Sequence, residues 1–246
     1  MTPGPVAGRR SAAKLLLAAF ALAAAGDLAA LLVDSGTGHA VSKPLLMPLL
    51  AAYVVTVNGP RLLTAALLFG WGGDTLLLFD TDPAFLAGMG SFAAGHVCYL
   101  VLFKRHGTPR ARGAWLVAAY AAALIVTVAL LWPDLPPDMR GPVAGYSLLL
   151  TAMALAATSL GLTAAAGGAL FLLSDTLIAT GVAEWPQAPR SDFWIMLTYI
   201  AAQFLLVRGV LAAQTRPPQR PARLTSESAA ATRSAEPTPS PRPRAR

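Results

Sequence analysis

The sequence predicts an all-α membrane protein, a compact bundle of about eight transmembrane helices. Of its 246 residues, 55% are hydrophobic and 13% are charged, and the mean hydropathy is +0.57. One water-soluble core of this chain length cannot hide so much apolar surface, whereas a bilayer accepts it. The charged residues gather in short connectors and in the C-terminal part, which leaves long apolar stretches between them.

These apolar stretches divide the chain into three expected parts. Residues 1–12 are a cytoplasmic N-terminal arm, residues 13–213 the eight-helix transmembrane domain, and residues 214–246 a disordered cytoplasmic tail whose Arg- and Pro-rich composition cannot bury enough apolar area to fold. A bilayer core of roughly 30 Å requires about 20 helical residues. The expected spans lie near 13–33, 44–58, 60–79, 84–103, 113–132, 142–160, 163–183 and 192–213.

The first two spans need separate justification. The first follows three basic residues and has the general look of a signal peptide, but it continues to about Val33 without a clear cleavage pattern, so we interpret it as a retained helix. The second begins at Lys43 and Pro44, because proline suits the first position of a helix. The other six follow through tight connectors, as a compact bundle requires.

The positions of Lys and Arg predict the orientation. Alternate connectors are basic or acidic, and the positive-inside rule then predicts a multi-pass protein of the cell membrane with both termini in the cytoplasm. The net charge of +7 is therefore a sign of topology and not of nucleic-acid binding. We expect the outer membrane boundary to hold three tryptophans as interfacial anchors, namely Trp132, Trp185 and Trp194. The basic group comprises Arg9, Arg10, Lys14, Arg61, Lys104, Arg105, Arg110, Arg112 and the arginines of the tail.

A short internal similarity suggests a repeat. Gly73-Asp74-Thr75-Leu76 in the third expected span is echoed by Ser174-Asp175-Thr176-Leu177 in the seventh, four spans later. Both segments run outward, so a duplication would relate two four-helix halves by an axis along the membrane normal. This 4+4 parallel repeat is a hypothesis.

Three aspartates lie inside the expected spans. A charged side chain at the centre of a span costs about 2.5 to 3.5 kcal/mol on insertion scales, so it needs a partner or a purpose. We interpret Asp74 and Asp175 as functional groups. Asp27 has two interpretations: it reaches towards the interface, or it pairs with Lys43.

Further polar residues lie near these aspartates in the expected spans: Lys43, Tyr146 and Tyr199 fall in the same outer layer of the membrane, and His96 lies close to the midplane. They have two interpretations, as hydrogen-bonding groups that hold the bundle together or as parts of a site. His96 is either a satisfied core histidine or a proton carrier, and Lys43 is either an interfacial anchor or a binding residue. The set is Lys43, His96, Tyr99, Tyr146, Tyr199 and Gln203.

Several common kinds of site are excluded by the sequence. His39, His96 and His106 lie in different segments, Cys98 is the one cysteine, and neither HExxH nor CxxC occurs, so we expect no metal site and no cofactor. No Gly-rich phosphate loop or GxSxG elbow is present, which argues against ATPases and serine hydrolases.

A series of short motifs resembles the YhhN/TMEM86 family over roughly residues 40 to 205. The resemblance implies a lysoplasmalogenase, which hydrolyses the vinyl ether bond of a lysoplasmalogen or a related lysolipid to a fatty aldehyde and a glycerophospho-head group. The expected partner is therefore a lysophospholipid. The motifs are Lys43-Pro44-Leu45, Gly73-Asp74, Gly95-His96-x-x-Tyr99, Pro142-Val143-x-x-Tyr146, Phe171-x-x-Ser174-Asp175 and Thr198-Tyr199-x-x-Ala202-Gln203.

The intramembrane residues fit such chemistry. A vinyl ether is hydrolysed by protonation of its β-carbon, which gives an oxocarbenium ion that water captures. Two carboxyl groups in different environments divide the roles of acid and anion in glycosidases. We assign these roles to Asp74 and Asp175 without deciding which one donates the proton. The other assignments are His96 as a proton relay, Tyr99, Tyr146, Tyr199 and Gln203 as substrate-binding residues, and Lys43 as a contact to the lipid phosphate.

Two alternatives remain. Carboxylates inside a membrane and a possible repeat are also typical of a proton-coupled transporter or lipid carrier. A purely structural or assembly role is the third hypothesis.

Overall fold

The computed structural model describes residues 5–107 and 113–215, and these ranges hold eight α-helices joined by short turns. The all-α bundle predicted from the sequence is thereby confirmed. The predicted tail and the connector with Arg110 and Arg112 lie outside the described residues. The helices are α1 (Pro5–Leu32), α2 (Gly36–Thr56), α3 (Arg61–Leu76), α4 (Asp82–His106), α5 (Ala114–Leu131), α6 (Pro137–Ala157), α7 (Leu162–Val182) and α8 (Ser191–Gln214), with a 3₁₀ turn at Thr158–Leu160.

Seven of these helices are long and apolar enough to cross a membrane, and α3 is the exception. With 16 residues α3 is about 24 Å long, which is less than a bilayer core of about 30 Å. It ends at Leu76, earlier than the expected residue 79. Asp74 therefore lies two residues before the end of its helix.

Three helices, α1, α2 and α6, begin five or more residues earlier than the sequence predicted. α1 includes residues expected in the N-terminal arm. α2 begins after Ser35, whose side chain accepts a hydrogen bond from the backbone N–H of Gly38, so Pro44 lies inside the helix instead of at its start. In the same way α6 begins at Pro137 and contains Pro142. Hydropathy placed these starts too late because the first turns of both helices carry polar residues.

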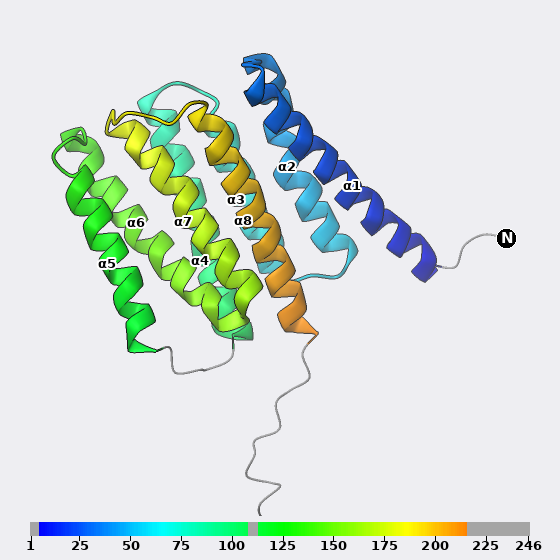
Figure 1. Cartoon of the computed structure of the whole chain (residues 1–246). Coiled ribbons are helices and arrows are strands. Elements are labelled where there is room, and N and C mark those ends of the chain that lie inside the picture. The colour runs from blue at the N-terminus through cyan, green and yellow to red at the C-terminus, as the bar shows by residue number, and fades with distance from the viewer. Residues whose placement is uncertain (1–4, 108–112, 216–246) are drawn as a thin grey trace, which may run out of the picture. The chain divides into compact units, whose positions relative to one another are not determined.

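The helices pack in a defined order. α1 packs on α2, α2 on α3, α3 on α4, α4 on α6, and α7 between α6 and α8 (Figure 1). α8 also contacts α1, α2, α3 and α4, and half of the residues in its most apolar segment are buried. Only 6% of the corresponding segment of α5 is buried, so α5 is a peripheral helix.

Close packing of α7 depends on two adjacent glycines that face different neighbours. A Cβ atom at Gly167 would lie 2.9 Å from the backbone nitrogen of Leu206 on α8, and one at Gly168 would lie 2.9 Å from Cα of Ala154 on α6. Backbone atoms cannot move aside as a side chain can. Small residues of this kind let helices approach closely in lipid, where packing drives association.

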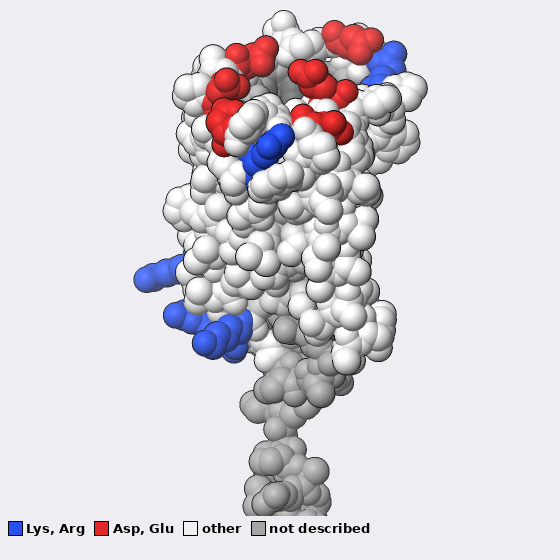
Figure 2. Space-filling model, turned by 90° about the vertical axis from the view of Figure 1, so that its left-hand side faces the viewer, with Lys and Arg blue, Asp and Glu red and all other residues white. Residues whose placement is uncertain are grey.

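Charge is distributed between the two ends of the bundle. The acidic side chains gather at one end, while basic side chains gather at the other, with a few basic groups among the acidic ones (Figure 2). Because successive helices run in opposite directions, the α1–α2, α3–α4, α5–α6 and α7–α8 turns all lie at the acidic end. That end carries Asp34, Asp80, Asp82, Asp134, Asp138, Glu184 and Asp192, all of which are exposed.

We predict that Gly167→Ala lowers the free energy of unfolding by about 1 to 3 kcal/mol, because the added methyl group overpacks the α7–α8 contact. The matched control is Gly181→Ala in the same helix, where a Cβ atom meets nothing within 4 Å. Thermal unfolding in a mild detergent compares the two variants. Equal midpoints for both would contradict this packing.

Candidate active site

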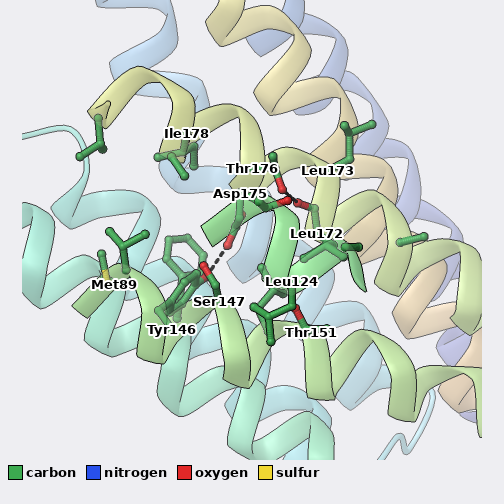
Figure 3. Close-up of a pocket in the computed structure, with 18 of the residues that line it drawn as sticks. Met89, Leu124, Tyr146, Ser147, Thr151, Leu172, Leu173, Asp175, Thr176 and Ile178 are labelled. Carbon is green, nitrogen blue, oxygen red and sulfur yellow. Dashed lines mark hydrogen bonds between the residues drawn. The ribbon is translucent and has the colours of Figure 1, made fainter. Parts of the chain in front are cut away.

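Asp175 of α7 is at the centre of a group of residues from three helices. It accepts a short hydrogen bond from the hydroxyl of Tyr146 on α6 (Figure 3). The same hydroxyl lies 3.0 Å from Nε2 of His96 on α4. The sequence predicted Asp175 and Tyr146 in the outer layer and His96 close to the midplane, and the structure joins the three through the hydroxyl of Tyr146.

The hydrogens of this group can be assigned from the number of donors. When the one hydrogen of the Tyr146 hydroxyl is donated to Asp175, Nε2 of His96 donates to the tyrosine oxygen. A neutral His96 then carries its lone pair on Nδ1, and this buried atom has no hydrogen-bond partner among the described residues. His96 is 1% exposed and its ring lies 4.8 Å from that of Phe171.

Asp74 of α3 is at the centre of a second group. Its Oδ2 accepts a hydrogen bond of 2.7 Å from the hydroxyl of Tyr199 on α8. Tyr199 in turn accepts a bond of 3.3 Å from Nε2 of Gln203, and Oε1 of that amide accepts a bond of 2.7 Å from the hydroxyl of Tyr99. Tyr199 and Gln203 lie four residues apart on α8 and share a helix face. His96 and Tyr99 lie near each other on α4 but belong to different groups.

Ring contacts of Phe171 and Phe92 link the two groups. Phe171 of α7 makes edge-to-face contacts with the rings of both His96 and Tyr199. Phe92 of α4 makes the same kind of contact with Phe171 and with Tyr199. Such contacts fix the orientation of the tyrosine whose hydroxyl holds Asp74.

Asp27 belongs to a third polar group, between α1 and α2. It is fully buried, and its Oδ1 accepts hydrogen bonds from Ser42 at 2.8 Å and from Nδ1 of His39 at 2.9 Å. The sequence considered Lys43 as its partner and overlooked Ser42 and His39. The reason is the early start of α2, which adds a polar helical turn facing α1.

Lys43 occupies a different place from the one expected. It was predicted at the outer start of its helix, but it lies eight residues into α2 and is 9% exposed. Among the described residues it forms no direct ion pair. It nevertheless lies within electrostatic range of Asp74. Lys43 thus belongs to the surroundings of Asp74.

A cavity of about 290 Å³ lies among α4, α5, α6 and α7. Asp175 and Tyr146 line it together with Ser147, Thr151 and a largely apolar set of side chains (Figure 3). Asp74, His96, Tyr99, Tyr199, Gln203 and Lys43 are not among the lining residues. Asp175 is accordingly half-buried, whereas Asp74 is 2% exposed.

The two carboxyl groups differ in their access to the cavity, because Asp175 lines it and Asp74 does not. At the cavity, the carboxyl group of Asp175 accepts a hydrogen bond from Tyr146, and Tyr146 is in turn bonded to His96. Asp74 does not line the cavity, and its hydrogen-bond partner Tyr199 contacts the ring of Phe92, which does line it. Among the described residues, no group of three or more His, Cys, Asp or Glu side chains is arranged to hold a metal ion.

The predicted repeat stays a prediction. The two aspartates receive similar tyrosine donors, but from helices that a 4+4 repeat does not make equivalent. Asp175 is bound from the preceding helix α6, and Asp74 from α8 at the end of the domain. The first helices of the two four-helix halves also differ. α1 packs broadly on α2, while α5 is largely exposed.

Comparison with known proteins gives a consistent result. The chain is 35% identical over 151 residues to human Lysoplasmalogenase TMEM86B, 38% identical over 144 residues to the same protein of Sus scrofa, and 33% identical over 192 residues to a Lysoplasmalogenase of Mycobacterium bovis. These matches cover 61%, 58% and 70% of this chain. It spans 64% and 61% of the length of the human and porcine proteins, and 72% of the mycobacterial one.

No solved structure matches the chain. The profile of the YhhN family matches residues 38–210, which include Asp74, Asp175 and every partner described for them above. The family resemblance found in the motifs is thereby confirmed. The chain belongs to the YhhN family.

Proposed function

We propose that this protein is a membrane hydrolase that cleaves the vinyl ether bond of a lysoplasmalogen or a closely related lysolipid. The names of its relatives support this activity. The observation that carries the proposal is the placement of Asp175, a carboxyl group in a largely apolar cavity of the membrane domain. Placing a carboxyl group inside a membrane costs free energy, so such a group marks a functional site by default.

Asp175 is proposed as the general acid. Its carboxyl group donates a proton to the β-carbon of the vinyl ether, and the electron pair of the double bond forms the new C–H bond. The resulting oxocarbenium ion is stabilised by the carboxylate that remains. Water then adds to the α-carbon and returns a proton to Asp175, and the hemiacetal collapses to an aldehyde and the glycerol hydroxyl.

Tyr146 and His96 are proposed as positioning residues for this acid. Because Tyr146 donates to Oδ2 of Asp175, the proton that Asp175 gives away is carried on the other oxygen, Oδ1. The same bond stabilises the carboxylate after transfer. His96 fixes the tyrosine hydroxyl from the side away from the cavity.

Asp74 is proposed to act on the reaction through its charge. It does not line the cavity, but it interacts electrostatically with Asp175 and lies in the field of Lys43. A negative charge behind Phe92 favours the positive transition state formed in front of it. Tyr199, Gln203 and Tyr99 would keep this second carboxyl group in place.

The main test is aldehyde release from a lysoplasmalogen by the purified protein in detergent micelles. We expect Asp175→Asn to lower the rate by about 100-fold or more, because the amide cannot act as the acid. We expect Asp74→Asn to lower it less, since that group does not reach the cavity. Asp192→Asn, the same change at an exposed position, is the control.

Full activity of Asp175→Asn would contradict the proposed acid. A carrier that uses the same carboxylates would move lipid across sealed vesicles without breaking a bond. Micelles have no two sides, so turnover there cannot be transport. An inactive but folded wild-type protein would therefore favour the carrier.

We further propose that the acidic end of the bundle faces the outside of the cell membrane and that both termini lie in the cytoplasm. The basic residues at the opposite end support this orientation. A cysteine at position 184, introduced as Glu184→Cys in a Cys98→Ser background, should react with an impermeant maleimide in intact cells. Arg61→Cys should react only after permeabilisation, and the reverse pattern would contradict the orientation.

A further inference from the structure

Three basic residues in the described part of the chain lie in the half of the bundle nearer its acidic end, and Figure 2 shows basic side chains among the acidic ones there. Arg190 of the α7–α8 turn forms an ion pair of 3.1 Å with Asp34 of the α1–α2 turn. Lys43 is buried on α2 and does not line the cavity. The third, Arg140 of α6, forms no ion pair with any of the described residues. Its positive charge is therefore available to an anion.

Arg140 lies beside one end of the cavity. It precedes Val143 by three residues and Ser147 by seven on α6, so it shares the helix face on which these two residues line the cavity. Its Nε donates a hydrogen bond of 3.2 Å to the carbonyl oxygen of Leu135. Leu135 packs in one cluster with Val143 and Val182, which both line the cavity. Arg140 is thus adjacent to the end of the cavity that lies nearer the acidic turns.

The guanidinium group of Arg140 has hydrogen-bonding capacity to spare. Its Nη2 donates to the carbonyl oxygen of Pro133 at 3.3 Å, and its central carbon lies 5.8 Å from the centre of the Trp132 ring. Within the described residues, its hydrogen bonds use two of the five N–H donors. Both acceptors are neutral carbonyl groups, so they hold the side chain without compensating its charge. A planar guanidinium group with free donors suits a phosphate, which it binds through two parallel hydrogen bonds.

We infer that Arg140 binds the phosphate group of the lysolipid while Asp175 protonates the vinyl ether. This inference rests on the proposed function, and it gives Arg140 the role that was expected of Lys43. The phosphate of a lysolipid is negatively charged. Bringing that charge to a largely apolar cavity costs free energy unless a cation meets it. Arg140 provides this cation at the end of the cavity.

The spacing of the two groups fits one lipid molecule. Arg140 lies six residues before Tyr146, whose hydroxyl binds Asp175, so the two positions are about 9 Å apart along α6. In a lysoplasmalogen the β-carbon of the vinyl ether and the phosphorus atom are seven bonds apart. An extended chain advances about 1.2 Å per bond, which gives about 8 Å. A lipid whose β-carbon meets Asp175 can therefore place its phosphate near Arg140.

The other half of the cavity fits the hydrocarbon chain of this lipid. Along α7 the cavity continues from Asp175 to Ala169, six residues and about 9 Å nearer the basic end. Leu150 and Leu172 line this part. A lipid that points its phosphate at Arg140 thus points its apolar chain at apolar side chains.

The test compares lipids that differ only in the phosphate. A tritiated saturated ether lysophospholipid and the corresponding alkylglycerol bind to the full-length protein in detergent, and a scintillation proximity assay measures each Kd. In Arg140→Gln, which loses the charge but can still donate to the turn, we expect the Kd of the phospholipid to rise about 10-fold or more. The Kd of the alkylglycerol should stay the same. Arg140→Lys keeps the charge and loses the planar fork, so its Kd for the phospholipid should lie between those of the wild type and Arg140→Gln.

Arg190→Gln is the matched control. Arg190 also donates to a carbonyl oxygen of a turn region, that of Leu31, but its charge is already paired with Asp34. Its two Kd values should equal those of the wild type. The wild-type protein should itself bind the phospholipid more tightly than the alkylglycerol, a comparison that needs no variant. In the aldehyde assay, Arg140→Gln should raise KM for the lysoplasmalogen and leave KM for the phosphate-free alkenylglycerol unchanged.

Two outcomes would overturn the inference. An equal rise of both Kd values in Arg140→Gln means that the residue only shapes the α5–α6 turn. An unchanged Kd for the phospholipid in that variant means that the phosphate is bound elsewhere. Both are measured without turnover and leave the proposed function standing. If instead the wild-type protein releases no aldehyde but loses its preference for the phospholipid in Arg140→Gln, the proposed hydrolysis fails while phosphate binding by Arg140 stands.

Discussion

The absence of water in the hydrocarbon core is the constraint on which the rest of this structure depends. Every polar group placed there must find its partner inside the bundle. Tyr199 provides that partner for Asp74, and Tyr146 provides it for Asp175, each from a neighbouring helix. Both tyrosines are held in turn, one by Gln203 and the other by His96. The carboxyl groups are thereby fixed by chains of contacts that run through five helices.

These contacts require helices that approach closely, and small residues make this possible. Gly167 and Gly168 bring α7 against α8 and α6, so Asp175 lies within reach of a tyrosine on α6. Gly70 has the same effect beside Asp74, because a Cβ atom there would lie 3.2 Å from both the hydroxyl of Tyr199 and the amide of Gln203. The close contacts between helices and the positions of the two carboxyl groups therefore depend on the same glycines. α5 takes little part in this packing, and it closes one side of the cavity as a peripheral helix.

Much of this arrangement could be predicted from the sequence. The apolar stretches indicated the eight helices, and the cost of burying Asp74 and Asp175 singled them out. The four-residue spacing of Tyr199 and Gln203 indicated their shared face. The starts of α2 and α6 could not be found by hydropathy, because their first turns are polar and each proline lies further inside. As a result Lys43 was expected at a helix start and His39 was overlooked.

The difference between the two carboxyl groups also could not be predicted. Both have nearly the same local sequence and similar depth, so nothing along the chain indicates that one lines a cavity and the other does not. The ring of Phe92 on α4 lines the cavity and contacts Tyr199 on α8, which holds Asp74, and this contact forms only in the fold. Arg140 was missed for a related reason. The sixth span was expected to begin at residue 142, which left Arg140 in a connector, and its place beside the cavity follows only from the earlier start of α6.

The central claim is that Asp175 meets the reacting carbon of a lysolipid inside the cavity between α4 and α7. The most direct measurement is a structure of the protein with a saturated ether analogue of a lysoplasmalogen, which binds but has no vinyl bond to protonate. The account predicts that the carbon next to the ether carbon lies about 3 to 3.5 Å from a carboxyl oxygen of Asp175. An analogue bound against Asp74, or bound with its ether out of contact with Asp175, would contradict it.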